Sequence, residues 1–490
     1  MAVATHTETE RKYETGAGAD LPALHEIPGV AEVTGPKAAT LEAIYFDTAD
    51  LRLARHGATL RRRTGGDDAG WHLKVPVGGD SRAELRLPLE AASTNAPPAA
   101  LADLTLGMAR GAEIRPVATV KTARDVWQLF GRKGKLLAEV TDDRVSATRL
   151  GDSPTVDSWR ELEVELADGD TDVLDRAEKM LRAAGVRRAK HASKLARVLP
   201  VPPDRVERPG RKATAGDAVL AYLRGQYDVI VHQDLRVRQD AADSVHQLRV
   251  AVRRLRSALR VYDRVVDGAR TERVRDELRW LGRRLADARD LEVQHAHFRA
   301  ALAALPAELV VGPVSARLTR HFGPAEAAAR RAALKTLRDK RYRRLLDELD
   351  RLLSDPPLTE RAGRPARKEL AKHVRRAYRK TDRRVRAATT DAELHRARKA
   401  AKRYRYALEV AEPVVGKKAK KARKRAKEFT RLLGEHQDGV VARPVLREQG
   451  MRSHLAGENG FTFGVLYEQE RARCDEVERK YLSRWRRVPS

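Results

Sequence analysis

The sequence predicts a chain of two parts, a strand-rich N-terminal half and an all-helical C-terminal half, and three observations support this prediction. The 490 residues carry a net charge of +29, yet residues 1–200 hold 29 Lys and Arg against 30 Asp and Glu, so the positive excess lies in residues 201–490. Charged and apolar residues alternate in the first half, which is typical of β-strands. A basic motif with helical spacing occurs twice in the second half, which indicates an internal duplication.

The first half is predicted to form many short strands. Charged residues at every second position share one face of an extended chain, and such sets recur: Glu8, Glu10 and Lys12; Arg61 and Arg63; Arg82, Glu84 and Arg86; Glu161, Glu163 and Glu165. Further apolar runs carry Lys74, Lys121 and Arg124. One amphipathic helix is expected over residues 170–184. Many strands in a row with few helices between them favour an antiparallel sheet or a barrel.

The grouping of these charges by sign points to a function. In a closed barrel, one face of every strand lines the interior. Carboxylates there would hold a hard cation through oxygen, and basic side chains would hold phosphate oxygens. For any single strand, charges that simply face solvent are the alternative, but that reading weakens over the whole set. The pattern therefore favours an interior that binds a metal-bound oligophosphate.

The opening segment ETERK resembles the ExExK signature of CYTH domains, the triphosphate tunnel metalloenzymes. The segments YFDT, LRRR, HLKVP, VKTAR, DDRV, ELEVEL and KHASK follow it in order, and the resemblance spans about residues 5–198. It implies an α+β domain built on an eight-stranded antiparallel β tunnel. It also implies hydrolysis of a triphosphate with Mg²⁺ or Mn²⁺.

The resemblance implies roles for individual side chains. The implied metal ligands are Glu8, Glu10, Asp143, Glu163 and Glu165, with Asp142 as the alternative to Asp143 and Glu161 as the alternative to one of the late pair. The implied phosphate contacts are Lys12, Arg61, Arg63, Lys74, Arg124 and Lys194. Glu8, Glu10 and Lys12 are expected to form the catalytic strand.

A site of this composition supports phosphoryl transfer to water. A metal and the basic side chains would orient the triphosphate and neutralise charge that develops on its oxygens. A carboxylate, or a second metal held by carboxylates, would lower the pKa of the attacking water. The sequence contains no Walker loop, GxGxxG or CxxC motif that would indicate a different chemistry.

The two halves are predicted to be joined by a proline-rich linker over residues 199–214, which contains LPVPP and PG. We therefore expect a tunnel domain over residues 1–198 and a helical domain over residues 215–490. The basic second half is expected to attract polyanions from a distance.

Two helices with a one-sided basic stripe are predicted over residues 245–260 and 394–408. Basic positions there recur at steps of three and four, which places them on one side of a helix. The first stripe comprises His246, Arg249, Arg253, Arg256 and Arg260, and the second comprises His395, Arg398, Lys402 and Arg405, with Glu409 in place of Arg260. Like charges at this spacing repel, so we expect an anion to offset them. Chance stripes in an Arg-rich chain are the alternative.

The two stripes belong to a longer repeat. His246 and His395 are 149 residues apart, and LADARD at 285–290 is echoed 148 residues later by LGEHQD at 433–438. Two motifs with nearly one offset predict two stripes around a pseudo-twofold axis. HQLRVAVRRLRSALRVY and HRARKAAKRYRYALEV resemble the signature helices of the CHAD domain, the conserved-histidine α-helical domain, over about residues 215–490. The resemblance implies an all-helical bundle with a basic cavity that binds inorganic polyphosphate.

Three features of the second half stay open at the level of sequence. His246 and His395 are either charged beside phosphate, neutral donors near the core, or core-packing residues. His373, Arg376, Lys380 and Arg383 form either a further wall of the cavity or a solvated face. The basic run at residues 417–427 is either a loop or a helix face, and its simplest interpretation is non-specific binding of nucleic acid or any other polyanion.

The composition of the chain bears on its cellular compartment and on whether it binds a membrane or nucleic acid. The single cysteine, Cys474, excludes an intramolecular disulfide and suits a reducing compartment. The N-terminus does not resemble a signal peptide, and no apolar run approaches the length of a membrane span. We expect a cytoplasmic protein without a membrane partner, associated with polyphosphate granules. Aromatic residues make up only 5% of the chain, which argues against base stacking on nucleic acid.

The sequence thus predicts a metal-dependent hydrolase of inorganic triphosphate or a related triphosphate, coupled to a helical domain that binds inorganic polyphosphate. A polyphosphate-binding protein with an inactive tunnel is the first alternative. A non-specific nucleic-acid binder, suggested by charge alone, is the second.

Overall fold

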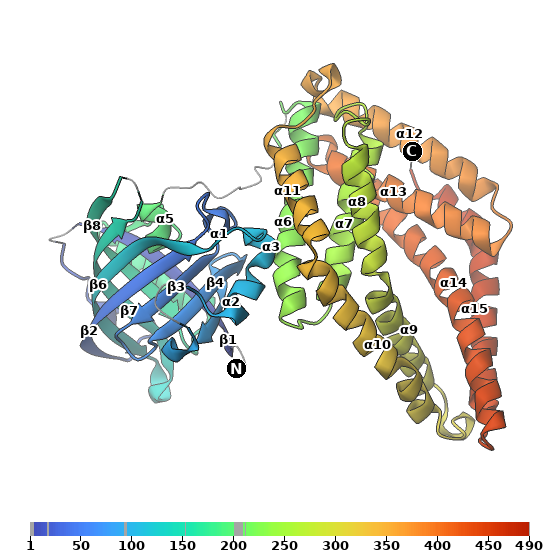
Figure 1. The fold of residues 1–490 in the computed structure, drawn as a ribbon, viewed down its shortest axis with the longest axis horizontal. Coiled ribbons are helices and arrows are strands. Elements are labelled where there is room, and N and C mark those ends of the chain that lie inside the picture. The colour runs from blue at the N-terminus through green and yellow to red at the C-terminus, as the bar shows by residue number, and fades with distance from the viewer. Residues whose placement is uncertain are drawn as a thin grey trace. The chain divides into compact units, whose positions relative to one another are not determined.

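The computed structural model describes residues 4–16, 19–92, 96–151, 153–199, 209–210 and 212–489. The chain divides into two compact units, Met1–Arg205 and Val206–Ser490 (Figure 1). Residues 200–208 and 211 of the predicted linker lie outside the described residues. Each unit is considered by itself.

Eight antiparallel strands form a closed ring in the N-terminal unit. They are β1 (Ala4–Thr15), β2 (Glu32–Asp47), β3 (Thr59–Thr64), β4 (Gly70–Gly78), β5 (Ser81–Leu87), β6 (Arg115–Phe130), β7 (Leu136–Arg149) and β8 (Thr155–Leu166). The ring runs β5-β4-β3-β2-β6-β7-β8-β1, and the first half of β1 pairs back with β5 to close it. This confirms the predicted antiparallel tunnel.

The ring closes on β1 because that strand changes partner halfway along its length. Residues 4–9 pair with β5, and residues 10–15 pair with β8. The register places Glu10 opposite Glu165 and Lys12 opposite Glu163. A two-residue strand, β9 (Arg187–Arg188), adds to the outer side of β1. The closing strand therefore carries the charges of the predicted catalytic segment.

Strand alternation sorts the side chains of the barrel into two faces. On β8, Leu162 and Val164 are buried in an apolar cluster with Leu174 and Leu181 of α4 (Thr171–Ala183), which packs against the outside of the barrel. The intervening glutamates of β8 therefore face the interior. Apolar residues stabilise the outer wall under the helix, and the interior is left to charged groups.

Short helices complete this unit. They are α1 (Arg52–Arg55), α2 (Ala99–Leu104), α3 (Leu106–Ala109) and α5 (Lys194–Val198). Ser193 caps α5 by accepting a hydrogen bond from the Ala196 amide. Leu195 and Val198 of α5 pack against Tyr45, Val120 and Trp159 of the barrel. This packing fixes Lys194, at the first position of α5, over the barrel interior.

The C-terminal unit is helical, as predicted. Its elements are α6 (Ala215–Arg238), α7 (Ser244–Val261), α8 (Glu272–Arg284), α9 (Ala286–Ala303), α10 (Val314–Arg338), α11 (Lys340–Ser354), α12 (Ala366–Arg386), α13 (Asp391–Val415), α14 (Lys417–Leu455) and α15 (Phe461–Arg486). Among the helices described, none is long and apolar enough to cross a membrane.

The predicted duplication appears as a repeated order of helices. A pair formed by α6 and α7 precedes a long hairpin of α9 and α10, and a pair formed by α12 and α13 precedes a long hairpin of α14 and α15 (Figure 1). Thr214 and Pro365, which precede α6 and α12, form a β-bridge. Helix α14 is continuous through Leu433, whereas the corresponding segment of the first copy is divided at Leu285 into α8 and α9.

Charged residues begin two helices of this unit. Helices α10 and α11 are separated at Asp339, whose side chain accepts the amide hydrogen of Arg341 as a helix cap. The basic run at 417–427 forms the first turns of α14, with Ala419, Ala422 and Ala426 buried and most of its lysines exposed.

Candidate functional site

The barrel encloses a charged cavity of about 650 Å³. All but one of the residues that the sequence assigned to the tunnel line this cavity: Glu8, Glu10, Lys12, Arg61, Arg63, Lys74, Arg124, Glu163, Glu165 and Lys194. Asp143 is the one that does not. Strands and helices far apart in sequence thus bring these side chains together, as a barrel interior requires.

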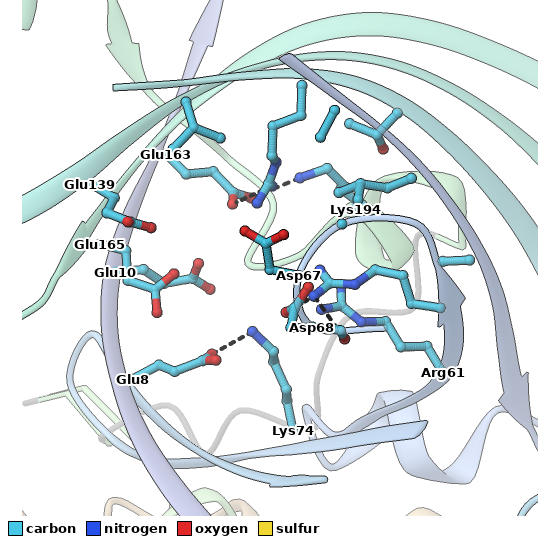
Figure 2. Close-up of a pocket in the computed structure, with 18 of the residues that line it drawn as sticks. Glu8, Glu10, Arg61, Asp67, Asp68, Lys74, Glu139, Glu163, Glu165 and Lys194 are labelled. Atoms are coloured by element: carbon cyan, nitrogen blue, oxygen red, sulfur yellow. Dashed lines mark hydrogen bonds and ion pairs between the residues drawn. The ribbon is translucent and has the colours of Figure 1, made fainter. Parts of the chain in front are cut away.

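Acidic side chains gather along one side of the cavity (Figure 2). This acid wall comprises Glu8, Glu10, Glu139 and Glu165. Burial, with Glu8 and Glu10 nearby, raises the pKa of Glu165 to about 7. Burial also raises the pKa of Glu8, against the opposing effect of Lys74. Burial would also raise the pKa of Glu10, but Lys12 outweighs it and the net shift is downward. Glu165 and Glu8 are therefore the members of the wall that lack sufficient positive charge around them and can accept a cation.

Basic side chains occupy the opposite side (Figure 2). Arg63 is only 5% exposed, and burial together with Arg61 and Arg124 lowers its pKa to about 9. Burial raises the pKa of Tyr45 less than Arg61 and Lys194 lower it, so the net shift of this phenol is downward. These shifts indicate an excess of positive charge on this side, which an anion would stabilise.

The floor of the cavity is a network of ion pairs centred on Glu163. Lys12 pairs with Glu163 and lies 3.0 Å from Glu10. Lys194 Nζ is 2.8 Å from Glu163, and Arg124 Nη2 is 3.1 Å from the other oxygen of Glu163. Burying charge is costly unless it is paired with good geometry. The network holds Lys12, Arg124 and Lys194 in fixed positions.

Asp143 lies beneath this floor and is fully buried. It accepts two hydrogen bonds from Arg124, at 2.7 and 2.6 Å, and its other contact is Lys194 at 2.7 Å. The alternative residue, Asp142, pairs with Arg160. Asp143 is therefore the aspartate that contacts two cations lining the cavity, Arg124 and Lys194.

A second cluster of carboxylates, at the floor of the cavity, is also a candidate metal site. Oxygens of Asp143, Glu161 and Glu163 lie within 4.8 Å of one another. The Lys194 ammonium stands 2.7 Å from Asp143, 2.7 Å from Glu161 and 2.8 Å from Glu163. A lysine that neutralises three carboxylates takes the place a cation would need. In the acid wall Glu8 pairs with Lys74 and Glu10 pairs with Lys12, but no single cation bridges the group and the pKa of Glu165 is raised by burial and neighbouring acids. The acid wall therefore fits a hard divalent cation better.

The structure adds residues to the cavity that the sequence did not assign a role. Tyr45, Asp67, Asp68, Arg86 and Glu139 line it. Tyr45 follows Leu41 and Ala43 at period two on β2, so alternation alone identifies it. Arg86 was visible as part of an alternating charged set. No periodic signal marks Asp67 and Asp68, which lie in a hairpin.

The two basic stripes of the C-terminal unit meet where α7 packs against α13. Arg253 Nε of the first stripe donates a hydrogen bond of 2.9 Å to the Tyr406 hydroxyl on α13. Burial, with Arg398 and Arg253 close by, lowers the pKa of Lys402 to about 6. Eight of the nine stripe residues are partly buried, and only Arg260 is exposed. The repeat predicted two stripes around a pseudo-twofold axis, and the structure brings residues of both stripes close together where the two helices pack.

Burial and neighbouring cations lower the pKa of both stripe histidines. For His246 the neighbouring cation with the largest effect is Arg289, and for His395 it is Lys399. Both imidazoles are thus biased toward the neutral form in the free protein. Neither His246 nor His395 is fully buried, so the sequence alternative of a purely core-packing role does not describe them.

Acidic residues offset the stripes at their ends. Arg249 Nη1 lies 2.9 Å from Asp290, within the first copy of the echoed segment, and Arg398 lies near Asp438 of the second copy. This explains why both copies of that segment end in aspartate. Glu409, which replaces Arg260, pairs with Arg405 at 3.2 Å.

Of the four basic residues that the sequence singled out on the third basic helix, α12, one lies in the core and another lies near the stripes. The His373 ring is buried and its Nδ1 donates to the Val261 carbonyl at 2.8 Å. Burial and then Arg384, Arg403 and Arg260 lower the pKa of Lys380. Helix α12 therefore packs through His373 and places Lys380 near the basic stripes.

Comparisons with known proteins match the chain to two domain families in succession. The model of the CYTH domain matches residues 6–199, and the model of the CHAD domain matches residues 221–447. The uncharacterized proteins MT2285 and Rv2226 from two strains of Mycobacterium tuberculosis are each 39% identical over 95% of this chain and 93% of their own length.

Similar solved structures include PptA from Streptomyces chartreusis, which is 22% identical and covers 56% of this chain and 100% of its own, with a TM-score of 0.48. The CHAD domain from the plant Ricinus communis is 28% identical and covers 59% of this chain and 99% of its own, with a TM-score of 0.47.

Proposed function

The chain belongs to the proteins in which a CYTH domain is followed by a CHAD domain, and from this premise we propose that it is a metal-dependent triphosphatase with an attached polyphosphate-binding domain. Inorganic triphosphate, or a related triphosphate, is the proposed substrate. One observation supports this most strongly: an acid wall and a group of arginines face each other across one cavity of about 650 Å³. A metal-bound oligophosphate needs both kinds of side chain at once.

The acid wall would hold the cation. Glu8 and Glu10 project from β1, and Glu165 projects from β8 directly opposite Glu10 in the strand register. All three line the cavity. Mg²⁺ or Mn²⁺ prefers such carboxylate oxygens and, when bound, supplies charge neutralisation on the phosphate and a lowered pKa for water. Glu163 and Asp143, which the sequence also assigned to the metal, would instead hold Lys194 and Arg124 in place.

The basic residues would hold and orient the phosphates. Arg61, Arg63 and Arg124 present forked donors that match phosphate oxygens, and Lys12, Lys74 and Lys194 add point charges. Arg124 is already fixed by two hydrogen bonds to Asp143, so it needs little reordering when substrate binds. Fixed donors aimed at developing charge are the main source of catalysis in phosphoryl transfer.

The buried carboxylates would also serve the attacking water. A carboxylate with a pKa near 7, such as Glu165, can share a proton with water at neutral pH. The acid wall lies on the opposite side from the arginines, which leaves room for a phosphate chain between them. Enclosure by the barrel limits the entry of bulk water and strengthens each electrostatic contact.

The experiment is a panel of phosphate-release assays with inorganic triphosphate, ATP and thiamine triphosphate. Each substrate is tested with Mg²⁺, with Mn²⁺ and with excess EDTA. The proposal expects release that depends on metal and is greatest with inorganic triphosphate, because the cavity offers charged groups and few surfaces that would read a base. Release that is equal with and without EDTA would remove the metal from the proposal.

We further propose that the C-terminal unit binds inorganic polyphosphate through both stripes. The specific support is the meeting of α7 and α13, which joins stripe cations that are partly buried and poorly neutralised. A polyphosphate chain has charge and spacing but no bases, and arginine is suited to reading both. A titration with long-chain polyphosphate against single-stranded RNA of matched charge tests this. Equal affinity for the two would favour a non-specific nucleic-acid binder.

A further inference from the structure

A glycine-rich hairpin carries two aspartates into the triphosphate cavity. It joins β3 to β4 and has the sequence TGGDDAG over residues 64–70. Gly65 and Gly66 adopt φ angles of +77° and +72°, and a Cβ atom on Gly65 would lie 2.1 Å from the Thr40 carbonyl oxygen. The turn therefore requires glycine and is held close to β2. As a result, Asp67 and Asp68 both line the cavity (Figure 2).

Asp68 is bound to the basic side of the cavity by four contacts. Its carboxylate pairs with Arg63, and Arg86 lies 3.9 Å away. Its backbone carbonyl accepts hydrogen bonds from His72 Nε2 at 2.9 Å and from Arg63 Nη2 at 3.5 Å. Asp67 is different, because its partner is Lys37 and both side chains are largely exposed. Of the two aspartates, Asp68 is thus the one whose carboxylate is paired with an arginine that is proposed to bind phosphate.

The surroundings of Arg63 explain why it holds a carboxylate. The residue is 5% exposed and lies near two other arginines, Arg61 and Arg124. A buried cation among cations needs an anion nearby. Asp68 supplies one, yet its side chain is 36% exposed, so the pair is partly solvated and can exchange for a stronger anion.

We propose that Asp68 is a built-in competitor for phosphate, which the hairpin holds against Arg63 in the free protein and which a triphosphate must displace. This inference rests on the proposed function of the tunnel and names what sets the strength of interaction that an anion needs in order to bind there. A ligand succeeds only if its phosphates interact with the arginines more favourably than one carboxylate does. Inorganic triphosphate meets that condition better than its shorter products, orthophosphate and pyrophosphate. Return of Asp68 to Arg63 then favours release of product.

A competing Asp68 and a purely structural Asp68 can be told apart by how the affinity for anions changes when the Asp68 charge is removed. If Asp68 only orients Arg63, removing its charge misplaces the arginine and weakens anion binding. If Asp68 competes, removing its charge strengthens the binding of every anion that has to displace it. The two readings therefore predict opposite changes in affinity.

The test measures the affinity of the full chain for inorganic triphosphate and for pyrophosphate by calorimetry in EDTA, so that no turnover occurs. The variants are Asp68→Asn and Asp68→Ser, which remove the charge, and Asp68→Glu, which keeps it. Asp125→Asn is the matched control, since it removes an aspartate from an ion pair with Arg144 that does not line the cavity. Arg61→Ala removes one of the proposed phosphate contacts, so a loss of affinity in this variant shows that the measured binding includes the tunnel. A thermal melt of each variant reports folding.

We expect Asp68→Asn and Asp68→Ser to bind pyrophosphate roughly three- to tenfold more tightly, as expected for loss of a partly exposed ion pair, and to gain a similar factor for triphosphate, because both ligands displace the same carboxylate. Asp68→Glu and Asp125→Asn should match the wild type. Weaker or unchanged binding by both neutral variants overturns the proposal. Because binding is measured without turnover, a protein that binds triphosphate but does not hydrolyse it would contradict the proposed function and leave this result valid.

Discussion

At Lys402, burial and nearby cations leave an ammonium group with too little negative charge around it. Its pKa falls to about 6 from an ordinary value of 10.5. The folded free protein therefore binds fewer protons at this site than the unfolded chain between about pH 6 and 10. By linkage, this group makes the free energy of unfolding rise with pH across that window. A bound polyanion would reverse the shift.

We therefore expect polyphosphate binding at pH 7.5 to be accompanied by uptake of a proton. Bound phosphate raises the pKa of Lys402 back above the working pH, so the group charges as the ligand binds. The measurement is calorimetry in buffers of different ionisation enthalpy. Lys402→Met should lower the number of protons taken up, by as much as one. If uptake is the same in this variant, another group titrates.

Lys194 is the second residue whose surroundings make a clear prediction. Its ammonium lies within 2.8 Å of Asp143, Glu161 and Glu163, and it is 8% exposed. Lys194→Met should lower the free energy of unfolding by about 3–5 kcal/mol, because it leaves buried carboxylates without their main partner. Chemical denaturation of the N-terminal unit measures this.

Arg197→Met is the matched control on the same short helix. Arg197 pairs with the more exposed Asp157 at 3.3 Å and stacks on Trp159, so its loss should cost about 1 kcal/mol or less. Equal effects of the two substitutions would mean that the Lys194 network contributes little to stability.

Among the elements, the strands follow the sequence pattern most closely. Period-two alternation identified which side chains of β1, β3 and β8 share a face, and those side chains meet in one cavity. The choice between Asp142 and Asp143 depended on the strand's orientation, which a single sequence leaves open. The hairpin at 64–70 could not be predicted to enter the cavity, since its position depends on contacts with β2 and His72.

The helices could also be predicted only in part from the sequence. Spacing of three and four located both stripes, and the common offset indicated that they would lie together. The break between α8 and α9 beside a continuous α14 was not predictable, because both copies have nearly the same periodicity there. Packing of His373 into the core depends on the Val261 carbonyl of another helix, which periodicity does not report.

At the level of the helix pair, both stripes should be needed for tight binding of polyphosphate. Replacing Arg249, Arg253 and Arg256 by alanine, or Arg398, Lys402 and Arg405, should weaken binding by roughly 100-fold or more, since each charge-assisted contact contributes on the order of 1.5–3 kcal/mol. Titration of each variant with long-chain polyphosphate measures the loss.

Replacing Lys420, Lys421 and Lys424 by alanine provides the control. It removes three charges from an exposed face of α14, where salt screens them. We expect a loss of affinity well below that of the stripe variants. If the control weakens binding as much as either stripe variant does, net charge and not the meeting of α7 and α13 accounts for the affinity.

The whole molecule combines a nearly neutral unit with a strongly basic one. Residues 1–200 hold about equal numbers of basic and acidic residues, and the +29 net charge therefore arises in the remainder. The tunnel thus depends on local placement of charge, whereas the helical unit also attracts polyanions at a distance. Activity in the tunnel and polyphosphate binding should consequently respond differently to salt.

The two units should also function when separated. A fragment of residues 1–205 should retain triphosphate hydrolysis, and a fragment of residues 210–490 should retain polyphosphate binding that weakens steeply with salt. Each unit has its own buried core, which makes independent folding the expected result. Insolubility of both fragments would show that the units share stabilising contacts.

The central claim is that the acid wall of the tunnel binds a metal that hydrolysis of triphosphate requires. The most direct test compares phosphate release from inorganic triphosphate by the wild-type chain and by Glu10→Gln, each with Mn²⁺ and with EDTA. Glutamine keeps the size of the side chain and removes the charge that would hold the cation. The account predicts metal-dependent release by the wild type and at least a 100-fold loss in Glu10→Gln, roughly the effect of removing a central catalytic group, with an unchanged melting profile. Release by Glu10→Gln equal to that of the wild type, or release that EDTA leaves intact, would contradict it.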